Sequence, residues 1–481
     1  MPRAATKNAR LQALYVRGSV RPTIQQLSQQ IRLGSLSPVE LTRECLARIE
    51  KLNPQLNAYI TVLSDFALAG ARRAEQEIQR GEYRGPLHGI PIGLKDIIDT
   101  AGTRTTAASA QYEDRIPTED AEVVRRLRAA GAVILGKQNL HEFAYGGSSI
   151  ISFFGEARNP WNMARVTGGS SGGSAASVGA GLGLAAVGTD TGGSIRLPAA
   201  YCGVVGLKPT YGRISMRGIL PLSPSLDHVG LITDSVYDAA LMLQALAGYD
   251  ADDPASSDVP VPDFTVGLEH FPQRLRIGVP RDFFFGDLHA EVAAAVESAI
   301  EVFAGLYVEI HELKLEVPTD RTLFLAEGYA VHKPMLTHSP ELYHPATRAR
   351  IEVGAGISAA AAQRARRELE AIRHAIQRVF DKVDVLLTPT APIPPPAIAY
   401  LREHPDELRP QELVMLRNTY PFDVWGIPTI SVPCGYTEDR LPIGLQLANS
   451  QWGEDRLLAA AYAYEQATGW HKMMPELMRT V

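Results

Sequence analysis

The chain has 481 residues, of which 45% are hydrophobic and 21% charged, and its formal net charge is −6. This composition is ordinary for a globular protein with a large core. A net negative charge gives no reason to expect a nucleic-acid-binding surface, and no charge-free apolar run is long enough to span a bilayer. The three cysteines are far apart, which argues against a disulfide framework or a cysteine zinc site and fits a cytoplasmic protein (Cys45, Cys202 and Cys434).

The N-terminus is basic, and its first acidic residue is Glu40. A transit peptide can have this composition, but no apolar segment follows, so we expect a frayed N-terminus instead. Ser37 and Pro38 then have the order of an N-cap and a first helical residue, and the helix they begin should end at Asn53-Pro54. A second helical pattern covers about 65–80. Residues 1–85 are therefore predicted to be a helical part that packs on the core and is not an independent domain.

From residue 86 onward, short apolar runs alternate with helical patterns. The predicted strands are 90–95, 133–135, 275–279, 383–387, 429–432 and 443–447. The predicted helices are 118–130, 235–246, 290–303, 359–380 and 454–467. Such alternation is typical of helices layered on a parallel or mixed sheet. The Pro-rich stretches 250–262 and 389–396 are interpreted as surface loops, so 86–481 is one core and the whole chain is one domain.

The segment 168–198 is unusually rich in Gly and Ser, and two Gly-Gly-Ser turns bracket a helix-then-strand pattern within it. The turns end at Ser170 and Ser194. Successive glycines let backbone N–H groups converge, and converging N–H groups can hold the oxyanion that forms during acyl transfer. A serine at the end of such a turn is placed to attack the same carbonyl. The alternative is that both turns are merely flexible loops.

A nucleophilic serine needs a base, and no histidine lies in or near this segment. A lysine can serve if burial keeps it neutral. Lys95 ends the apolar run 90–95 and is followed by Asp96, although a lone lysine there is more often a surface strand end. To act as a base, Lys95 must have a pKa well below that of a free lysine, so Asp96 should point away from it or be engaged elsewhere.

Together these residues resemble the amidase signature family. The matching stretches are GIPIGLKDIIDTAG (89–102), GKQNLHEFAYGGSS (136–149), RNPWNMARVTGGSSGGSAASV (158–178), GTDTGGSIRLPAAYCGVVGLKPTYGRIS (188–215), DHVGLIT (227–233) and IPTISVPCG (427–435). The resemblance implies a single α/β fold with a large mixed sheet covered by helices on both faces. It covers about residue 24 to the C-terminus.

The resemblance also implies a Ser–Ser–Lys triad. Ser194 matches the nucleophile, Ser170 the bridging serine and Lys95 the lysine. The backbone N–H groups of the turn match the oxyanion hole (Thr191, Gly192, Gly193 and Ser194). Asp190 and Arg196 flank this turn and are expected to hold it. No metal or organic cofactor is implied.

Four motifs in the sequence suggest other chemistry and are set aside. Gly168–Gly172 fits the nucleophile elbow G-x-S-x-G, but no strand precedes it. Gly131–Lys137 fits a phosphate-binding loop, but its centre is apolar and predicts a strand. His141-Glu142 begins the zinc motif H-E-x-x-H, but Tyr145 replaces its second histidine. Cys202 is interpreted as a small buried residue rather than a nucleophile.

The implied reaction is hydrolysis of a small-molecule carboxylic amide through an acyl-enzyme, by a stand-alone enzyme that acts on neither nucleic acid nor membrane. A homodimer stays open. The alternative is the glutaminase (A) subunit of a tRNA-dependent amidotransferase, which works with partner subunits. That subunit carries an acidic residue about where Leu416 stands, three positions before Thr419, and Leu416 cannot bind the amino group of glutamine. The segment 141–145 also looks more like stand-alone amidases.

The sequence does not identify the amide. Specificity is expected to come from 321–356 and 420–425, where four aromatic residues could line an apolar pocket or belong to the core (Tyr329, Tyr343, Phe422 and Trp425). Arg350 could pair with a substrate carboxylate, but the pattern favours a helix-surface arginine.

Overall fold

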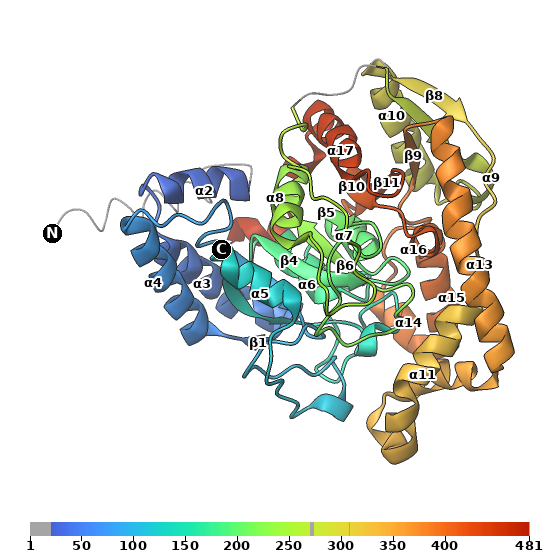
Figure 1. The fold of residues 1–481 in the computed structure, drawn as a ribbon, viewed down its shortest axis with the longest axis horizontal. Helices are drawn as coiled ribbons and strands as arrows, with labels where there is room; N and C mark the ends of the chain where they lie inside the picture. The colour runs from blue at the N-terminus through green and yellow to red at the C-terminus, as the bar shows by residue number, and fades with distance from the viewer. Residues whose placement is uncertain (1–20, 270–273, 307, 481) are drawn as a thin grey trace.

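The computed structural model describes residues 21–269, 274–306 and 308–480, so most of the basic N-terminus lies outside the described residues. One mixed sheet of eleven strands forms the centre, in the order β1-β3-β2-β4-β6-β5-β10-β11-β9-β7-β8 (Figure 1). The strands are β1 (Tyr59–Val62), β2 (Pro91–Lys95), β3 (Val133–Gln138), β4 (Ala185–Asp190), β5 (Val205–Lys208), β6 (His228–Thr233), β7 (Arg276–Val279), β8 (Glu309–Glu312), β9 (Val385–Pro389), β10 (Thr429–Tyr436) and β11 (Pro442–Ala448). The predicted α/β class with a large mixed sheet is confirmed.

The helices are α2 (Ile24–Arg32), α3 (Pro38–Leu56), α4 (Ser64–Gln79), α5 (Glu122–Ala129), α6 (Gly172–Gly179), α7 (Arg196–Cys202), α8 (Val236–Leu246), α9 (Arg281–Phe284), α10 (Ala290–Gly305), α11 (Thr322–His338), α12 (Pro345–Glu352), α13 (Ala359–Gln377), α14 (Ile398–Glu403), α15 (Pro405–Met415), α16 (Tyr420–Trp425) and α17 (Glu454–Thr468). No helix in the described part of the chain is long and apolar enough to cross a membrane.

The helices cover both faces of the sheet, and alternate residues of a strand point toward opposite faces. In β4, Ala185 and Val187 belong to the core shared with α2, α5, α8 and α17, whereas Ala186 belongs to the core shared with α3, α6 and α7. Successive strand residues point to opposite faces, so a strand covered on both sides is apolar throughout. The small residues of 172–189 accordingly form α6 and β4 at the centre of the fold. Every residue of both elements is buried.

The N-terminal part differs from the prediction in two respects. It contributes a strand as well as helices, because β1 pairs antiparallel with β3 at the edge of the sheet. Helix α3 also does not end at Asn53-Pro54. It continues to Leu56 and stops at Asn57, whose left-handed backbone (φ 48°) donates its N–H to the Asn53 carbonyl at 2.7 Å. The predicted cap is correct, since Ser37 Oγ accepts from the N–H groups of Val39 and Glu40.

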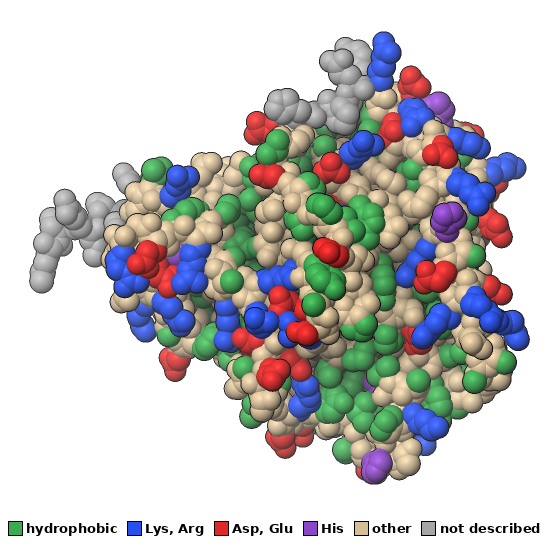
Figure 2. Space-filling view, in the orientation of Figure 1, with side chains coloured by type: hydrophobic (Ala, Val, Ile, Leu, Met, Phe, Trp, Pro, Cys, Tyr) green, Lys and Arg blue, Asp and Glu red, His purple; other side chains and the backbone are tan. Residues whose placement is uncertain are grey.

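The order of strands brings Lys95 and the second Gly-Gly-Ser turn close together. β2 lies between β3 and β4 and is parallel to both. Lys95 at the end of β2 is therefore next to the end of β4, where the second Gly-Gly-Ser turn begins. The face seen in Figure 2 carries basic and acidic side chains interspersed, which agrees with the modest net charge.

Candidate active site

Lys95 is completely buried at the end of β2. Its Nζ donates to Ser170 Oγ at 2.8 Å and to Thr189 Oγ1 at 2.9 Å. Burial lowers the pKa of Lys95 to about 7, although the nearby carboxylates of Asp190 and Asp227 oppose this shift. A large fraction of Lys95 is thus neutral near pH 7, as a base must be.

Asp96 is engaged away from Lys95, as predicted. Its Oδ2 accepts hydrogen bonds from the Thr106 N–H at 3.0 Å and from Thr106 Oγ1 at 2.5 Å, and its Oδ1 lies 3.8 Å from Lys137 Nζ. The carboxylate next in sequence to Lys95 is therefore matched with a different buried lysine. Asp96 is absent from the charges that raise the pKa of Lys95.

The first Gly-Gly-Ser turn holds Ser170 above Lys95. The Gly169–Ser170 peptide bond is cis, and the Ser170 carbonyl accepts from the His141 N–H at 3.1 Å and from Ser149 Oγ at 3.2 Å. The next amide, that of Ser171, donates to the Ser194 carbonyl at 3.2 Å. The two turns therefore lie side by side, and Ser170 and Ser194 are neighbours in space although 24 positions separate them.

The second turn needs glycine for both conformation and space. Gly193 has a φ of +127°, and a Cβ at this position would stand 2.0 Å from Thr419 Oγ1. Thr419 Oγ1 in turn donates to the Gly192 carbonyl at 2.8 Å. The Gly193 N–H, expected in the oxyanion hole, donates to Asp190 Oδ1 at 2.5 Å. This amide is committed to the turn itself, which corrects the expectation for that residue.

Asp190 and Arg196 hold the turn from behind. Asp190 Oδ2 accepts from the Ile195 N–H at 3.1 Å and from Arg196 Nε at 2.9 Å, and both side chains are fully buried. Burial alone would raise the pKa of Asp190, but the Arg196 guanidinium outweighs it and holds the pKa far below its usual range. The same guanidinium donates to Asp423 at 2.6 Å and to Gln446 Oε1 at 2.8 Å. Sequence reasoning missed Asp423 and Gln446, because no local spacing connects them to Arg196.

The segment 420–425 is the buried helix α16, and its aromatic side chains belong mainly to the core. Phe422 and Trp425 pack with Phe284 in one apolar cluster. Tyr343 packs against Phe143, and Tyr329 lies at the edge of the large core. Tyr343, Phe422 and Trp425 are therefore buried in the core, although Trp425 also lines a surface pocket beside α13, and Tyr329 is only half-buried.

Arg350 is buried, so the expectation of a helix-surface arginine is wrong. Its Nη1 donates to the Tyr145 carbonyl at 2.9 Å and lies 3.0 Å from Glu412 Oε2 and 3.1 Å from His141 Nε2. Burial lowers the pKa of His141 to about 3, which keeps this imidazole neutral. α12 turns Arg350 inward because the fully buried Glu412 of α15 requires a cation.

The structure is consistent with setting aside the four alternative motifs. Residues 159–167 before Ser170 contain no named strand, and Gly131–Lys137 leads into β3. Glu142 accepts hydrogen bonds from Ser109 and from the His344 N–H, and the described residues contain no cluster of three or more metal-ligating side chains. Cys202 is buried, and burial raises the pKa of its thiol.

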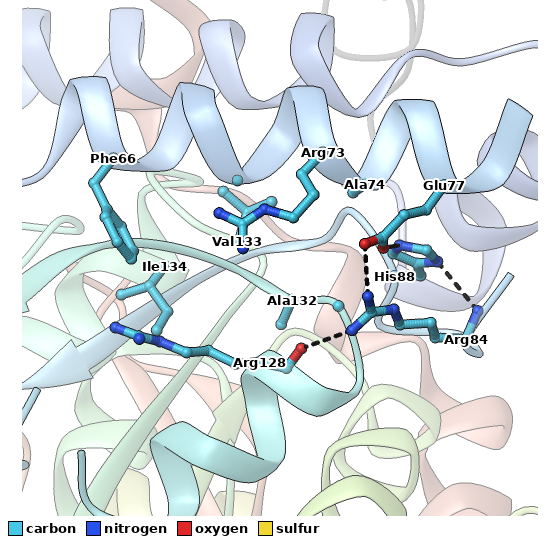
Figure 3. A pocket seen from close by; sticks show the side chains of 12 residues that line it. Phe66, Arg73, Ala74, Glu77, Arg84, His88, Arg128, Ala132, Val133 and Ile134 are labelled. Carbon is cyan, nitrogen blue, oxygen red and sulfur yellow. Dashed lines mark hydrogen bonds and ion pairs between the residues drawn. The ribbon is translucent and has the colours of Figure 1, made fainter. Parts of the chain in front are cut away.

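A cavity of about 140 Å³ lies beside α4, far from the triad (Figure 3). Its lining includes Val133 at the start of β3, whereas Lys95 ends the neighbouring parallel strand β2, so the two sites are at opposite ends of these strands. Three of its ionisable side chains meet one another, because Glu77 accepts from Arg84 at 2.6 Å and lies 3.0 Å from His88 Nε2. None of the predicted catalytic residues lines this cavity.

Comparison with known proteins finds relatives over most of the chain. A family model described as Amidase matches residues 40–458. The A subunit of glutamyl-tRNA(Gln) amidotransferase from Geotalea daltonii (strain DSM 22248 / JCM 15807 / FRC-32) is 41% identical over 94% of this chain and 98% of its own. Its counterpart from Roseiflexus castenholzii (strain DSM 13941 / HLO8) is 41% identical over 95% and 97%.

Solved structures of several activities are also similar. A chain of the complex described as "An unexpected vestigial protein complex reveals the evolutionary origins of an s-triazine catabolic enzyme" has a TM-score of 0.86 and 33% identity over 93% of this chain and 99% of its own. The native peptide amidase from Stenotrophomonas maltophilia has a TM-score of 0.80 and 32% identity over 93% and 97%. This chain belongs to the amidase signature family.

Proposed function

We propose that this chain hydrolyses a carboxylic amide through an acyl-enzyme on Ser194. The observation that carries the proposal is the 2.8 Å hydrogen bond between Lys95 Nζ and Ser170 Oγ, made by a buried lysine whose pKa falls to about 7. Neutral Lys95 takes the proton of Ser170 while Ser170 takes that of Ser194, because a hydroxyl both donates and accepts. The relay returns the proton to the leaving nitrogen, and water then releases the acid.

The oxyanion is held by the backbone N–H groups of the second turn. Since the Gly193 amide donates to Asp190, the amides of Thr191, Gly192 and Ser194 carry this role. The ion pair of Asp190 with Arg196 fixes the turn before substrate arrives. Such preorganised donors stabilise the charge that develops in the transition state without rearrangement.

A fluorophosphonate probe tests this assignment directly. It should label the protein once, and mass spectrometry of the digested protein should place the adduct on Ser194. Prior incubation with a substrate amide should slow labelling. Labelling elsewhere, or none at all, would contradict catalysis by this serine and favour a binding or scaffold role.

The leading candidate within this chemistry is the glutaminase role in an amidotransferase assembly. Curated relatives that carry the amidotransferase name are about 41% identical over nearly the full length of both chains, and this similarity outweighs the expectation of a stand-alone enzyme. In that role, ammonia released at Ser194 is used by partner subunits. This chain isolated with its subunits should then release ammonia from its amide faster than the chain by itself.

A stand-alone amidase is the second candidate, and one contact favours it. Leu416 lies against the nucleophile turn, with its Cδ2 atom 3.0 Å from where a Cβ on Gly193 would stand. An apolar side chain at this place offers nothing to the ammonium group of glutamine. The discriminating measurement is ammonia release from glutamine and from simple amides by the purified chain. Full activity without subunits on an amide other than glutamine supports the second candidate.

A further inference from the structure

The stretch DHVGLIT (227–233) carries part of the family resemblance, but no step of the proposed reaction uses it. It contains β6, which pairs antiparallel with β4 so that His228 is opposite Asp190. The next pair in the same register is Asp227 and Thr191, which flank the two strands. Opposed side chains of an antiparallel pair lie on the same face, with Cβ atoms about 4.5–5.5 Å apart. The fold therefore holds a carboxylate beside the residue that leads into the nucleophile turn.

The Asp227 carboxylate is bound at both of its oxygens. Its Oδ1 accepts from Thr191 Oγ1 at 2.6 Å, and its Oδ2 accepts from the N–H groups of Leu222 at 2.8 Å and Ser223 at 3.0 Å. Asp227 is 3% exposed and Thr191 is 2% exposed, so water does not compete for these bonds. Hydrogen bonds to an ionised acceptor are stronger than neutral ones. The Thr191 side chain can therefore leave its position only by breaking a strong contact.

The backbone N–H of Thr191 is one of the three amides left for the oxyanion. It donates to no other group in the described part of the chain, whereas the Gly193 N–H donates to Asp190. A β-branched side chain such as threonine is restricted at χ1, so fixing Oγ1 also restrains the backbone that carries the amide. The contact with Asp227 thus holds an unused N–H donor in a fixed direction.

Asp227 is also a carboxylate without a cation of its own. Among the residues that the structure describes it forms no ion pair, whereas Asp190 is paired with Arg196. Its charge acts on Lys95 and favours the protonated lysine. The geometry agrees, because Lys95 Nζ contacts Thr189 Oγ1, two residues before the partner of Asp227, and side chains two apart along a strand share a face. Lys95 therefore becomes positive within the field of an uncompensated negative charge.

The other ionisable groups around Asp227 are compensated or neutral. Glu327 of α11 pairs with Arg366 at 2.6 Å. Tyr211 lies under the Arg373 guanidinium at 4.2 Å, and burial raises its pKa. Burial also raises the pKa of Asp227 and the charge of Glu327 adds to this, while the three hydrogen bonds that Asp227 accepts oppose it and favour the ionised form. The negative charge of Asp227 is thus left for the active site.

We infer that Asp227 is a positioning residue for the reaction at Ser194, where it holds the Thr191 N–H toward the oxyanion and supplies the counter-charge for Lys95 once the lysine has taken its proton. The inference rests on the proposed hydrolysis and deepens it. It holds for both candidate functions, because it concerns the acyl transfer that they share. Asp227 itself touches no substrate and transfers no proton.

The test uses a fluorophosphonate, whose reaction with Ser194 needs the same base and oxyanion hole but no knowledge of the amide. The second-order rate of labelling is measured against pH. Asp227→Asn should lower the plateau about tenfold or more, since loss of one oxyanion donor costs about 10²–10³-fold and a misdirected donor costs part of that. It should also move the acid limb about half a pH unit or more to lower pH, because protonated Lys95 loses a favourable charge.

Thr191→Val separates the two roles of Asp227. Valine keeps the shape of the side chain and removes the donor, but the charge of Asp227 stays. The plateau should fall about tenfold, as in Asp227→Asn, and the acid limb should stay where it is in the unmodified protein. The double variant should lose no more of the plateau than Asp227→Asn does, because both changes break the same contact.

Asp238→Asn is the matched control. Asp238 is also a buried carboxylate that accepts two backbone N–H groups, those of Ile24 at 2.9 Å and Gln25 at 3.2 Å, but it is not among the charges that act on Lys95. This change should leave the plateau and the acid limb unchanged, even if it lowers the melting temperature as much as Asp227→Asn does.

Four outcomes would overturn the inference. They are a plateau and limb in Asp227→Asn like those of the unmodified protein, equal losses in Asp227→Asn and Asp238→Asn, the same limb shift in Thr191→Val as in Asp227→Asn, and a full plateau in Thr191→Val. The last of these decides the matter by itself if Asp227→Asn does not fold. Failure to label Ser194 in the unmodified protein would instead overturn the proposed function, and the inference with it.

Discussion

Lys95 and Lys208 are both fully buried lysines whose pKa values burial lowers to about 7, yet their surroundings differ in one respect. Lys95 Nζ contacts two hydroxyl groups, those of Ser170 at 2.8 Å and Thr189 at 2.9 Å, and reaches one backbone carbonyl, that of Thr189, only at 3.5 Å. Lys208 Nζ contacts two backbone carbonyls, those of Ile427 at 2.8 Å and Pro209 at 3.1 Å. A carbonyl can only accept a hydrogen bond, whereas a hydroxyl can also give up its proton. A lowered pKa therefore makes a base only where a hydroxyl is within reach.

The largest effect should come from removing the nucleophile, Ser194. Ser194→Ala should lower kcat on the order of 10⁶-fold, as loss of the nucleophile does in other serine hydrolases. The fold should persist, because the neighbouring residues of the turn are glycines and little packing is lost. Steady-state kinetics with an unchanged melting temperature checks this. Retention of more than about a tenth of the activity would remove Ser194 from the mechanism.

Replacing each lysine by methionine should have different effects on activity and stability. Lys95→Met should lower kcat/KM by about 10³–10⁴-fold, at the upper end of what general base catalysis contributes. Lys208→Met should change kcat/KM by less than about threefold and act on stability instead, because it leaves the buried Pro209 carbonyl without a donor, at about 1–3 kcal/mol, while the Ile427 carbonyl keeps Thr429 Oγ1 at 3.2 Å. Urea unfolding measured beside the kinetics distinguishes the two effects. Comparable losses of activity in both variants would break the comparison.

Ser170→Ala should have a smaller effect than Lys95→Met. It removes the hydroxyl that joins Lys95 to Ser194, but a water molecule in the vacated space can carry the proton. We expect kcat to fall by about 10²-fold, within the range attributed to a positioned proton-transfer group. The pH dependence should survive in this variant, because Lys95 remains the final acceptor. A loss as large as that of Ser194→Ala would mean that water cannot replace Ser170.

The acid limb of the pH profile should report Lys95. The unperturbed pKa is 10.5 and the folded value is about 7, so the lysine is neutral above about pH 7 and charged below it. Only the neutral form accepts a proton, so kcat/KM should be level above pH 7 and fall about tenfold per pH unit below it. The residual activity of Lys95→Met should lack this limb. If that variant keeps the wild-type acid limb, another group is the base.

The contrast between the two lysines shows where sequence reasoning succeeded and where it stopped. Long apolar runs correctly placed β2, β3, β10 and β11, and the resemblance supplied Lys95, Ser170 and Ser194. The edge strand β8, Glu-Ile-His-Glu, was missed because it is polar and largely exposed, so no hydrophobic pattern marks it. β5 and β6 were also missed, because both lie within stretches that the resemblance quoted only as motifs.

The sequence could not predict side-chain pairs between residues far apart in the chain, and the reason is physical. Asp423 meets Arg196 across 227 positions, and Glu412 meets Ser148 across 264. These pairs form only when the sheet brings its two halves together, and no periodicity records them. The burial of Arg350 was missed for the same reason, because its ion pair with Glu412 also joins residues far apart in the chain.

The smallest expected effect concerns the other hydroxyl at Lys95. Thr189 Oγ1 accepts from Lys95 Nζ at 2.9 Å, but Thr189 is in β4 and is not joined to the nucleophile as Ser170 is. Thr189→Val keeps the shape of the side chain and removes only this contact. The hydrogen bond favours charged Lys95, which donates it, so its loss should lower the pKa of Lys95 slightly and move the acid limb of kcat/KM to lower pH. The plateau should fall no more than about threefold, because the route through Ser170 is intact. A larger loss on the plateau would show that the position of Lys95, and not only its proton affinity, depends on Thr189. In that case the two hydroxyl groups act together, and the difference from Lys208 lies in orientation as much as in chemistry.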